Sequence, residues 1–146
     1  MDTIVVGVDG SDESKKALRW AYEEARLRGT TLKAVYAWLH PGLAGPGFVP
    51  PFAIDVSVLR RDAEELLERI VSEMLGNEPE MTVERVVVGG SAPRVLIEAA
   101  EGAELLVVGS RGHGGFAGLL LGSVSQQCAH HAPCPIVIIR PRRKRS

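Results

Sequence analysis

The sequence lacks the features that define several large classes of protein. Its 146 residues include two cysteines, Cys128 and Cys134, which are too few to build the disulfide framework of a small secreted domain. No apolar run approaches the roughly 20 residues of a membrane-spanning helix. No secretory leader is visible either, because Gly7 and Asp9 interrupt the first apolar run. We therefore expect one soluble cytoplasmic domain, with an apolar share of 45% that supplies an ordinary core.

Acidic residues are absent from the last part of the chain. Residues 1–104 contain all 18 Asp and Glu and 11 of the 17 Lys and Arg, a balance of −7, whereas residues 105–146 contain six basic residues and no acid. The net charge of −1 conceals this division and indicates no preference for nucleic acid or membrane. The part of the chain that best suits an anionic ligand therefore follows Glu104.

Three common motifs of nucleotide and ester chemistry are missing. No Gly-Lys pair is present, so the chain has no Walker A loop, and it has no G-x-S-x-G nucleophile elbow. Gly112, Gly114 and Ala117 match a loose dinucleotide fingerprint. The acidic residue that this fingerprint needs about 20 positions later is absent, which argues against a dinucleotide site.

Two further clusters near the C-terminus have ordinary interpretations. Cys128, His130, His131 and Cys134 do not have the spacing of a tetrahedral zinc site, and histidines at a helix end are favoured by its dipole. Residues 142–146 form a basic tail after a domain of residues 1–141. Nucleic acid or anionic lipid would attract this tail, but we interpret it as a solvated, disordered terminus.

Short apolar runs alternate with amphipathic segments along the chain. These runs predict buried strands at residues 4–8, 32–38, 83–88, 105–108 and 136–139. Helices are expected between them, after the candidate N-caps Ser11, Asp55, Ser91 and Ser123. The alternation predicts an α/β fold with a single open five-stranded parallel sheet and helices on both faces.

A glycine-rich loop follows the fourth expected strand. Six glycines fall within fourteen residues, at positions 109, 112, 114, 115, 118 and 122, and Ser123 follows as a candidate N-cap. Glycine lets a ligand approach the backbone closely, and a helix N-terminus presents free N–H groups and a positive dipole end. This combination predicts an anion site, with phosphate as the usual anion.

The spacing Gly109, two residues, Gly112, nine residues, Gly122-Ser123 resembles the ATP-binding signature of the universal stress protein family. The resemblance runs from VVGVDGS at residues 5–11 to HAPCPIV at residues 131–137. It implies a sheet of order 3-2-1-4-5, similar to the Rossmann-like adenine nucleotide α-hydrolase folds. In that order strands 1 and 4 are neighbours, so Asp9 and Gly109 stand together at a topological switch point, where ligands bind.

The resemblance also implies ATP and Mg²⁺ as ligands. Asp9 is the expected ligand of ribose hydroxyls or of phosphate-bound Mg²⁺, although alone it would be interpreted as a turn residue. Backbone groups of Ala37, within a residue or so, would hold adenine. The implied nucleotide-binding residues are Asp9, Ala37, Gly109, Arg111, Gly112, Gly122, Ser123, Val124 and Ser125. Whether Arg111 neutralises phosphate or is only solvated stays open.

The family resemblance further implies a homodimer through the fifth strand, Ile136, Val137, Ile138 and Ile139, an apolar edge that invites pairing. We expect a nucleotide-dependent regulatory module of the stress response rather than an enzyme, in which ATP orders the glycine loop and residues 39–55 and changes the surface shown to a protein partner. The alternatives are a slow Mg²⁺-dependent ATPase and a dimeric scaffold whose nucleotide site is vestigial.

Overall fold

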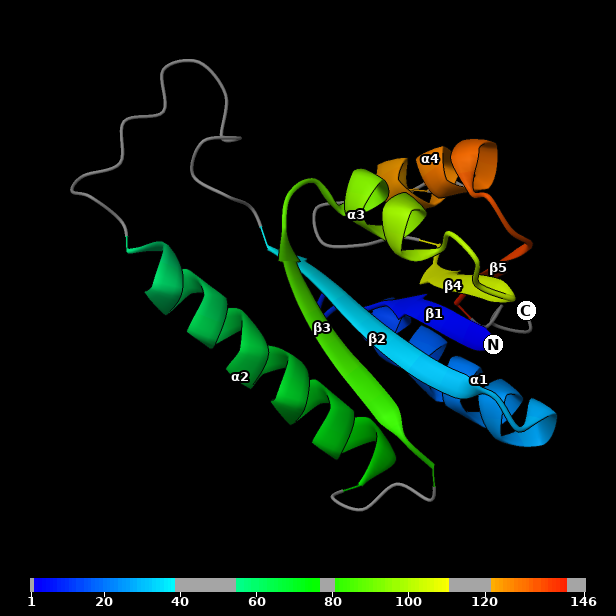
Figure 1. The fold of residues 1–146 in the computed structure, drawn as a ribbon, viewed down its shortest axis with the longest axis horizontal. Coiled ribbons are helices and arrows are strands. Elements are labelled where there is room, and N and C mark those ends of the chain that lie inside the picture. Colours follow the sequence, from blue (N-terminus) through cyan, green and yellow to red (C-terminus); the bar gives the residue numbers. More distant parts are fainter. Residues whose placement is uncertain (1, 39–54, 77–80, 111–121, 142–146) are drawn as a thin grey trace, which may run out of the picture.

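The computed structural model describes residues 2–38, 55–76, 81–110 and 122–141. Strands and helices alternate through these ranges (Figure 1). In chain order the elements are β1 (Thr3–Gly7), α1 (Asp12–Arg28), β2 (Thr31–Trp38), α2 (Val56–Leu75), β3 (Val83–Gly89), α3 (Ala92–Ala99), β4 (Leu105–Gly109), α4 (Ser123–His131) and β5 (Ile136–Ile139). The expectations for residues 39–54, 111–121 and the tail 142–146 lie outside the described residues.

The five strands form one parallel sheet of order β3-β2-β1-β4-β5, which confirms the expected fold. β1 lies at the centre, where Val6 pairs with Ala34 of β2 on one side and with Val107 of β4 on the other. The strands that are covered on both faces are the apolar runs of the sequence. β3 and β5 are the two edges of the sheet.

Helices cover both faces of this sheet (Figure 1), and the described residues contribute two to each face. On one face, α1 packs through Ala17, Leu18 and Ala21 beside α2, against strand residues that include Ile4 and Val6. On the other face, α3 and α4 pack against the alternate strand residues. Successive strand side chains point to opposite faces, so each strand contributes to both halves of the core.

The helix ends follow the expected capping residues, with one correction. Ser11 caps α1 and accepts a hydrogen bond from the Ser14 N–H at 3.2 Å, and Asp55 caps α2. Ser91 occupies the N-cap position of α3 without a side-chain cap bond. The prediction that Ser123 caps α4 is wrong: Gly122 is the N-cap, because its backbone is extended and its carbonyl accepts the first helical bond, from the Gln126 N–H.

Candidate functional site

The carboxyl ends of β1 and β4 lie side by side at the centre of the sheet. After β1 the chain enters α1 on one face, whereas the helix that follows β4, α4, packs on the opposite face. This is the topological switch point of the fold, the place where open α/β sheets bind ligands. The strand order therefore brings together residues that are about 100 positions apart in the sequence.

Asp9 is held in a tight turn between β1 and α1. Its Oδ1 accepts a hydrogen bond from the Ser11 N–H at 2.8 Å, and its own N–H donates to Ser14 Oγ at 3.2 Å. Gly10 has a φ of 87°, which an L side chain rarely adopts. Ser14 is buried and also donates its hydroxyl to the Ser11 carbonyl. Asp9 thus begins the turn before α1, which fixes where its carboxylate stands, and its role as a ligand stays a prediction.

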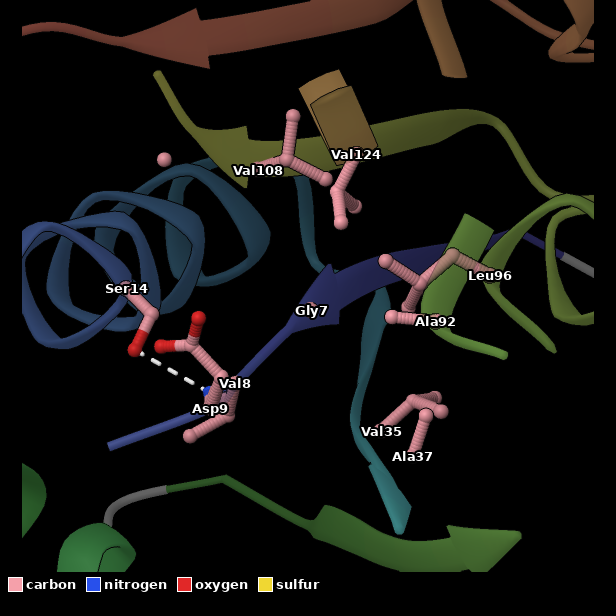
Figure 2. A pocket seen from close by; sticks show the side chains of 11 residues that line it. Gly7, Val8, Asp9, Ser14, Val35, Ala37, Ala92, Leu96, Val108 and Val124 are labelled. Carbon is pink, nitrogen blue, oxygen red and sulfur yellow. Dashed lines mark hydrogen bonds between the residues drawn. The ribbon is translucent and has the colours of Figure 1, made fainter. Parts of the chain in front are cut away.

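A cavity opens beside this turn, which we call the switch-point pocket (Figure 2). It is lined by Gly7, Val8, Asp9, Ser14, Val35, Ala37, Ala92, Leu96, Val108, Gly109 and Val124. In Figure 2, Asp9 and Ser14 lie at one end, and aliphatic side chains from β2, α3, β4 and α4 form the remaining walls. An apolar cavity with a few convergent polar groups is the usual form of a small-molecule site.

Four of the nine residues expected at the nucleotide site line this pocket: Asp9, Ala37, Gly109 and Val124. They come from the β1–α1 turn, β2, β4 and the first turn of α4. Val35, expected to pack near Ala37, also lines it. Arg111 and Gly112 lie outside the described residues.

The other three expected residues stand at the start of α4. The Gly122 N–H donates to the Ser110 carbonyl at 2.6 Å. The buried Ser125 Oγ lies 2.8 Å from the Ser110 carbonyl oxygen and 3.0 Å from that of Gly122. These two groups are therefore engaged within the protein in this conformation, whereas Ser123 is exposed. Their role as phosphate ligands stays a prediction.

Sequence reasoning missed six of the pocket residues: Gly7, Val8, Ser14, Ala92, Leu96 and Val108. Gly7 has a specific role, because a Cβ there would lie 2.7 Å from Leu96 Cδ1. Because Gly7 has no side chain, Leu96 of α3 can pack closely against the end of β1. The signal available in the sequence was positional, since strand ends and the first turns of the following helices meet at the same edge of a parallel sheet.

The described residues were also compared with the requirements of a metal site, a reactive cysteine and a membrane-spanning helix. Within the described residues, no group of three or more His, Cys, Asp and Glu could hold a metal ion. Burial raises the pKa of the Cys128 thiol to about 11 and raises that of Cys134, so both favour the unreactive protonated form. No helix in the described part of the chain is long and apolar enough to cross a membrane.

Comparison with known proteins gives a consistent set of relatives. The family described as "Universal stress protein family" matches residues 1–140. A universal stress protein of Mycobacterium tuberculosis is 38% identical over 138 residues, which are 94% of this chain and 45% of the relative. The chain thus spans about half the length of the curated relatives it matches.

Two solved structures show the same fold over nearly the whole length of both chains. A universal stress protein in complex with cAMP is 30% identical and superposes with a TM-score of 0.62, covering 95% of this chain and 96% of the other. One from Archaeoglobus fulgidus, in complex with dAMP, is 24% identical with a TM-score of 0.62, covering 95% and 98%. At that identity the second comparison concerns the fold alone.

Proposed function

The chain belongs to the universal stress protein family, and from this premise we propose that it binds an adenine nucleotide in the switch-point pocket. The observation that carries the proposal is the convergence of an apolar cavity, the Asp9 carboxylate and the start of α4 at the ends of β1 and β4. The relative that is 30% identical and solved with cAMP supports the same class of ligand. We propose ATP as the nucleotide.

The described residues fit the two halves of a nucleoside. Val35, Ala37, Leu96 and Val108 offer aliphatic walls to a planar base. The small side chain of Ala37 leaves the β2 backbone accessible, which suits hydrogen bonds to the edge of adenine. Asp9 lies at the other end of the pocket (Figure 2), where a carboxylate accepts hydrogen bonds from ribose hydroxyls.

The phosphates would then extend toward the N-terminus of α4. In the proposed complex, Gly109 and Gly112 allow close approach of the backbone, and Gly122, Ser123, Val124 and Ser125 belong to the helix start that attracts anions. Arg111 would add a positive charge. The alternative role of Asp9, in place of the ribose contact, would be to hold Mg²⁺, which when bound neutralises charge on the phosphate oxygens.

We propose binding rather than turnover as the function, so that nucleotide occupancy changes the surface offered to a partner. The described pocket supports this because it offers aliphatic walls, backbone, one carboxylate and the Ser14 hydroxyl, which is already bonded to the Asp9 N–H and the Ser11 carbonyl. The β5 edge of the sheet supports a homodimer, because its four apolar residues are only half-buried in the single chain. The cytoplasmic location and the limits of the domain stay predictions.

Calorimetric titration of nucleotide-stripped protein with Mg-ATP, ADP, AMP, cAMP and adenosine tests the proposal. Ala37→Leu should abolish binding because it fills the pocket. Val88→Leu is the matched control, since Val88 pairs with Ala37 on the neighbouring strand and does not line the pocket. Absence of heat with every ligand from folded protein would reject the nucleotide site and favour the scaffold alternative.

A turnover assay separates the binding module from the ATPase. Purified protein with Mg-ATP should release no phosphate above the background of a heat-denatured sample. Steady phosphate release that Asp9→Ala abolishes while ATP binding survives would assign a catalytic role to Asp9 and overturn the binding-only proposal.

A further inference from the structure

Ser110 directly follows β4 and is almost fully buried, at 1% exposure. Each of its polar groups is hydrogen-bonded within the protein. Its N–H donates to the Ile139 carbonyl at 2.8 Å. Its carbonyl accepts from the Gly122 N–H and from the Ser125 hydroxyl. Its hydroxyl donates to Glu13 Oε2 at 2.9 Å. One residue thus joins β5, the start of α4 and the first turn of α1.

Glu13 is pressed against this junction. A Cβ at Gly109 would lie 3.0 Å from the Glu13 carbonyl carbon and 3.1 Å from Glu13 Cβ, so only glycine fits there without a shift. The missing side chain lets the first turn of α1 reach the end of β4. The half-buried carboxylate of Glu13 then meets the Ser110 hydroxyl across 97 positions of sequence.

The dipole of α1 does not account for this contact. Acidic residues in a first helical turn are favoured by the helix dipole, and both Asp12 and Glu13 meet that description. Asp12 is exposed, whereas the Glu13 carboxylate accepts a hydrogen bond from the hydroxyl of Ser110, which follows β4. A hydrogen bond to a charged acceptor is about twice as strong as a neutral one, which suits it to fix a junction.

We propose that Glu13 is a positioning residue: through its hydrogen bond to Ser110 it holds the N-terminus of α4 at the switch-point pocket. This inference rests on the proposed function for its purpose, because the α4 start is where the phosphates are proposed to bind. The mechanical link itself concerns only the protein. Glu13 fixes the Ser110 side chain, and the Ser110 carbonyl fixes Gly122 and Ser125.

The substitutions separate the hydrogen bond from the charge. Glu13→Ala removes the acceptor. Glu13→Gln keeps an amide oxygen that accepts from the Ser110 hydroxyl but removes the negative charge. Ser110→Ala removes the donor and should reproduce the effect of Glu13→Ala, and the double variant should be no worse than either single one, because both act on one bond. Asp12→Ala is the matched control for the dipole of α1.

Amide hydrogen exchange of ¹⁵N-labelled protein, followed by NMR, measures the link without any nucleotide. Exchange of the Gly122 amide should accelerate about tenfold in Glu13→Ala, the loss of one charge-assisted hydrogen bond. It should accelerate less in Glu13→Gln, which keeps a weaker neutral hydrogen bond, and stay near wild type in Asp12→Ala. The Val8 amide, bonded to the Val35 carbonyl, is the internal reference for global destabilisation. Equal acceleration at Val8 and Gly122, or unchanged Gly122 exchange, would overturn the proposal.

The affinities of the Glu13 variants for Mg-ATP and for adenosine test whether the bond between Glu13 and Ser110 matters at the proposed phosphate site. If the nucleotide binds, Glu13→Ala should weaken Mg-ATP binding severalfold and leave adenosine binding unchanged, whereas Glu13→Gln should weaken Mg-ATP binding less than Glu13→Ala does. Equal losses for both ligands would overturn a role at the phosphates. If wild type binds no nucleotide while the Gly122 amide still responds as expected, the proposed function fails and the positioning role of Glu13 stands.

Discussion

Replacing Gly109 with alanine would place a methyl group against the first turn of α1. The new Cβ would lie 3.0 Å from the carbonyl carbon of Glu13, 3.1 Å from its Cβ and 3.2 Å from its carbonyl oxygen. Two of these atoms belong to the backbone of a helix and cannot rotate away. β4 is held by β1 and β5 on its two sides, so it cannot retreat easily either.

The expected loss of stability in Gly109→Ala follows from the rigidity of these contacts. Overpacking of a filled core costs about 1–3 kcal/mol, and contact with backbone places Gly109→Ala in the upper half of that range. For a protein of this size, a loss of about 2–3 kcal/mol corresponds to a fall in Tm of roughly 5–10 °C. Thermal unfolding followed by circular dichroism measures it directly.

Gly7→Ala is the matched comparison, at the end of the neighbouring strand β1. Its Cβ would come even closer to a neighbour, 2.7 Å from Leu96 Cδ1, but the end of a leucine side chain can rotate away. We therefore expect Gly109→Ala to lower Tm more than Gly7→Ala, despite the longer contact. The reverse order, or an unchanged Tm for Gly109→Ala, would refute the reasoning.

Three further predictions concern the edge, the buried thiol and the α4 junction. Ile138→Lys in the β5 edge should convert the proposed homodimer to a monomer in size-exclusion chromatography with light scattering, whereas Val88→Lys on the opposite edge strand should not; a dimer that survives Ile138→Lys would place the interface elsewhere. Burial raises the pKa of Cys128 from 9.0 to about 11, so folding favours the neutral thiol. The contribution of this thiol to stability is fully present below pH 9 and is lost as the pH rises toward 11. The free energy of unfolding in urea should therefore fall less steeply across this window in Cys128→Ala than in wild type. Ser125→Ala should lower the free energy of unfolding by about 1 kcal/mol, because the buried hydrogen bond from the Ser125 hydroxyl to the Ser110 carbonyl is lost while that from the Gly122 N–H remains. No change in urea unfolding would mean that the bond from the Gly122 N–H to the Ser110 carbonyl is enough to hold the junction.

The fold could be predicted from the sequence because its signals are local and repeated. Apolar runs alternate with capped amphipathic helices, and all five strands form within a residue of the expected limits. The order of the strands came from the family resemblance, since periodicity contains no information about neighbours. The error at Ser123 arose because a hydroxyl residue favours an N-cap, but extended backbone at Gly122 starts the helix one residue earlier.

The site was predictable only in part. Asp9, Ala37 and Gly109 follow strand cores, so a parallel sheet places them at one edge, and they do line the pocket. The contact between Glu13 and Ser110 was not predictable, because no local pattern joins residues 97 positions apart. It depends on how closely α1 approaches β4, which the missing side chain of Gly109 permits.

The measurement that tests the nucleotide site most directly is mapping of amide chemical shifts on adding Mg-ATP to nucleotide-stripped, ¹⁵N-labelled protein. The proposed site predicts the largest shifts at Asp9, Ala37 and Val124, around the switch-point pocket. The amides of α2 and the β3 edge should move least. Saturable shifts centred on α2 and β3, or no shifts at all in folded protein, would contradict a nucleotide site at the junction of β1 and β4.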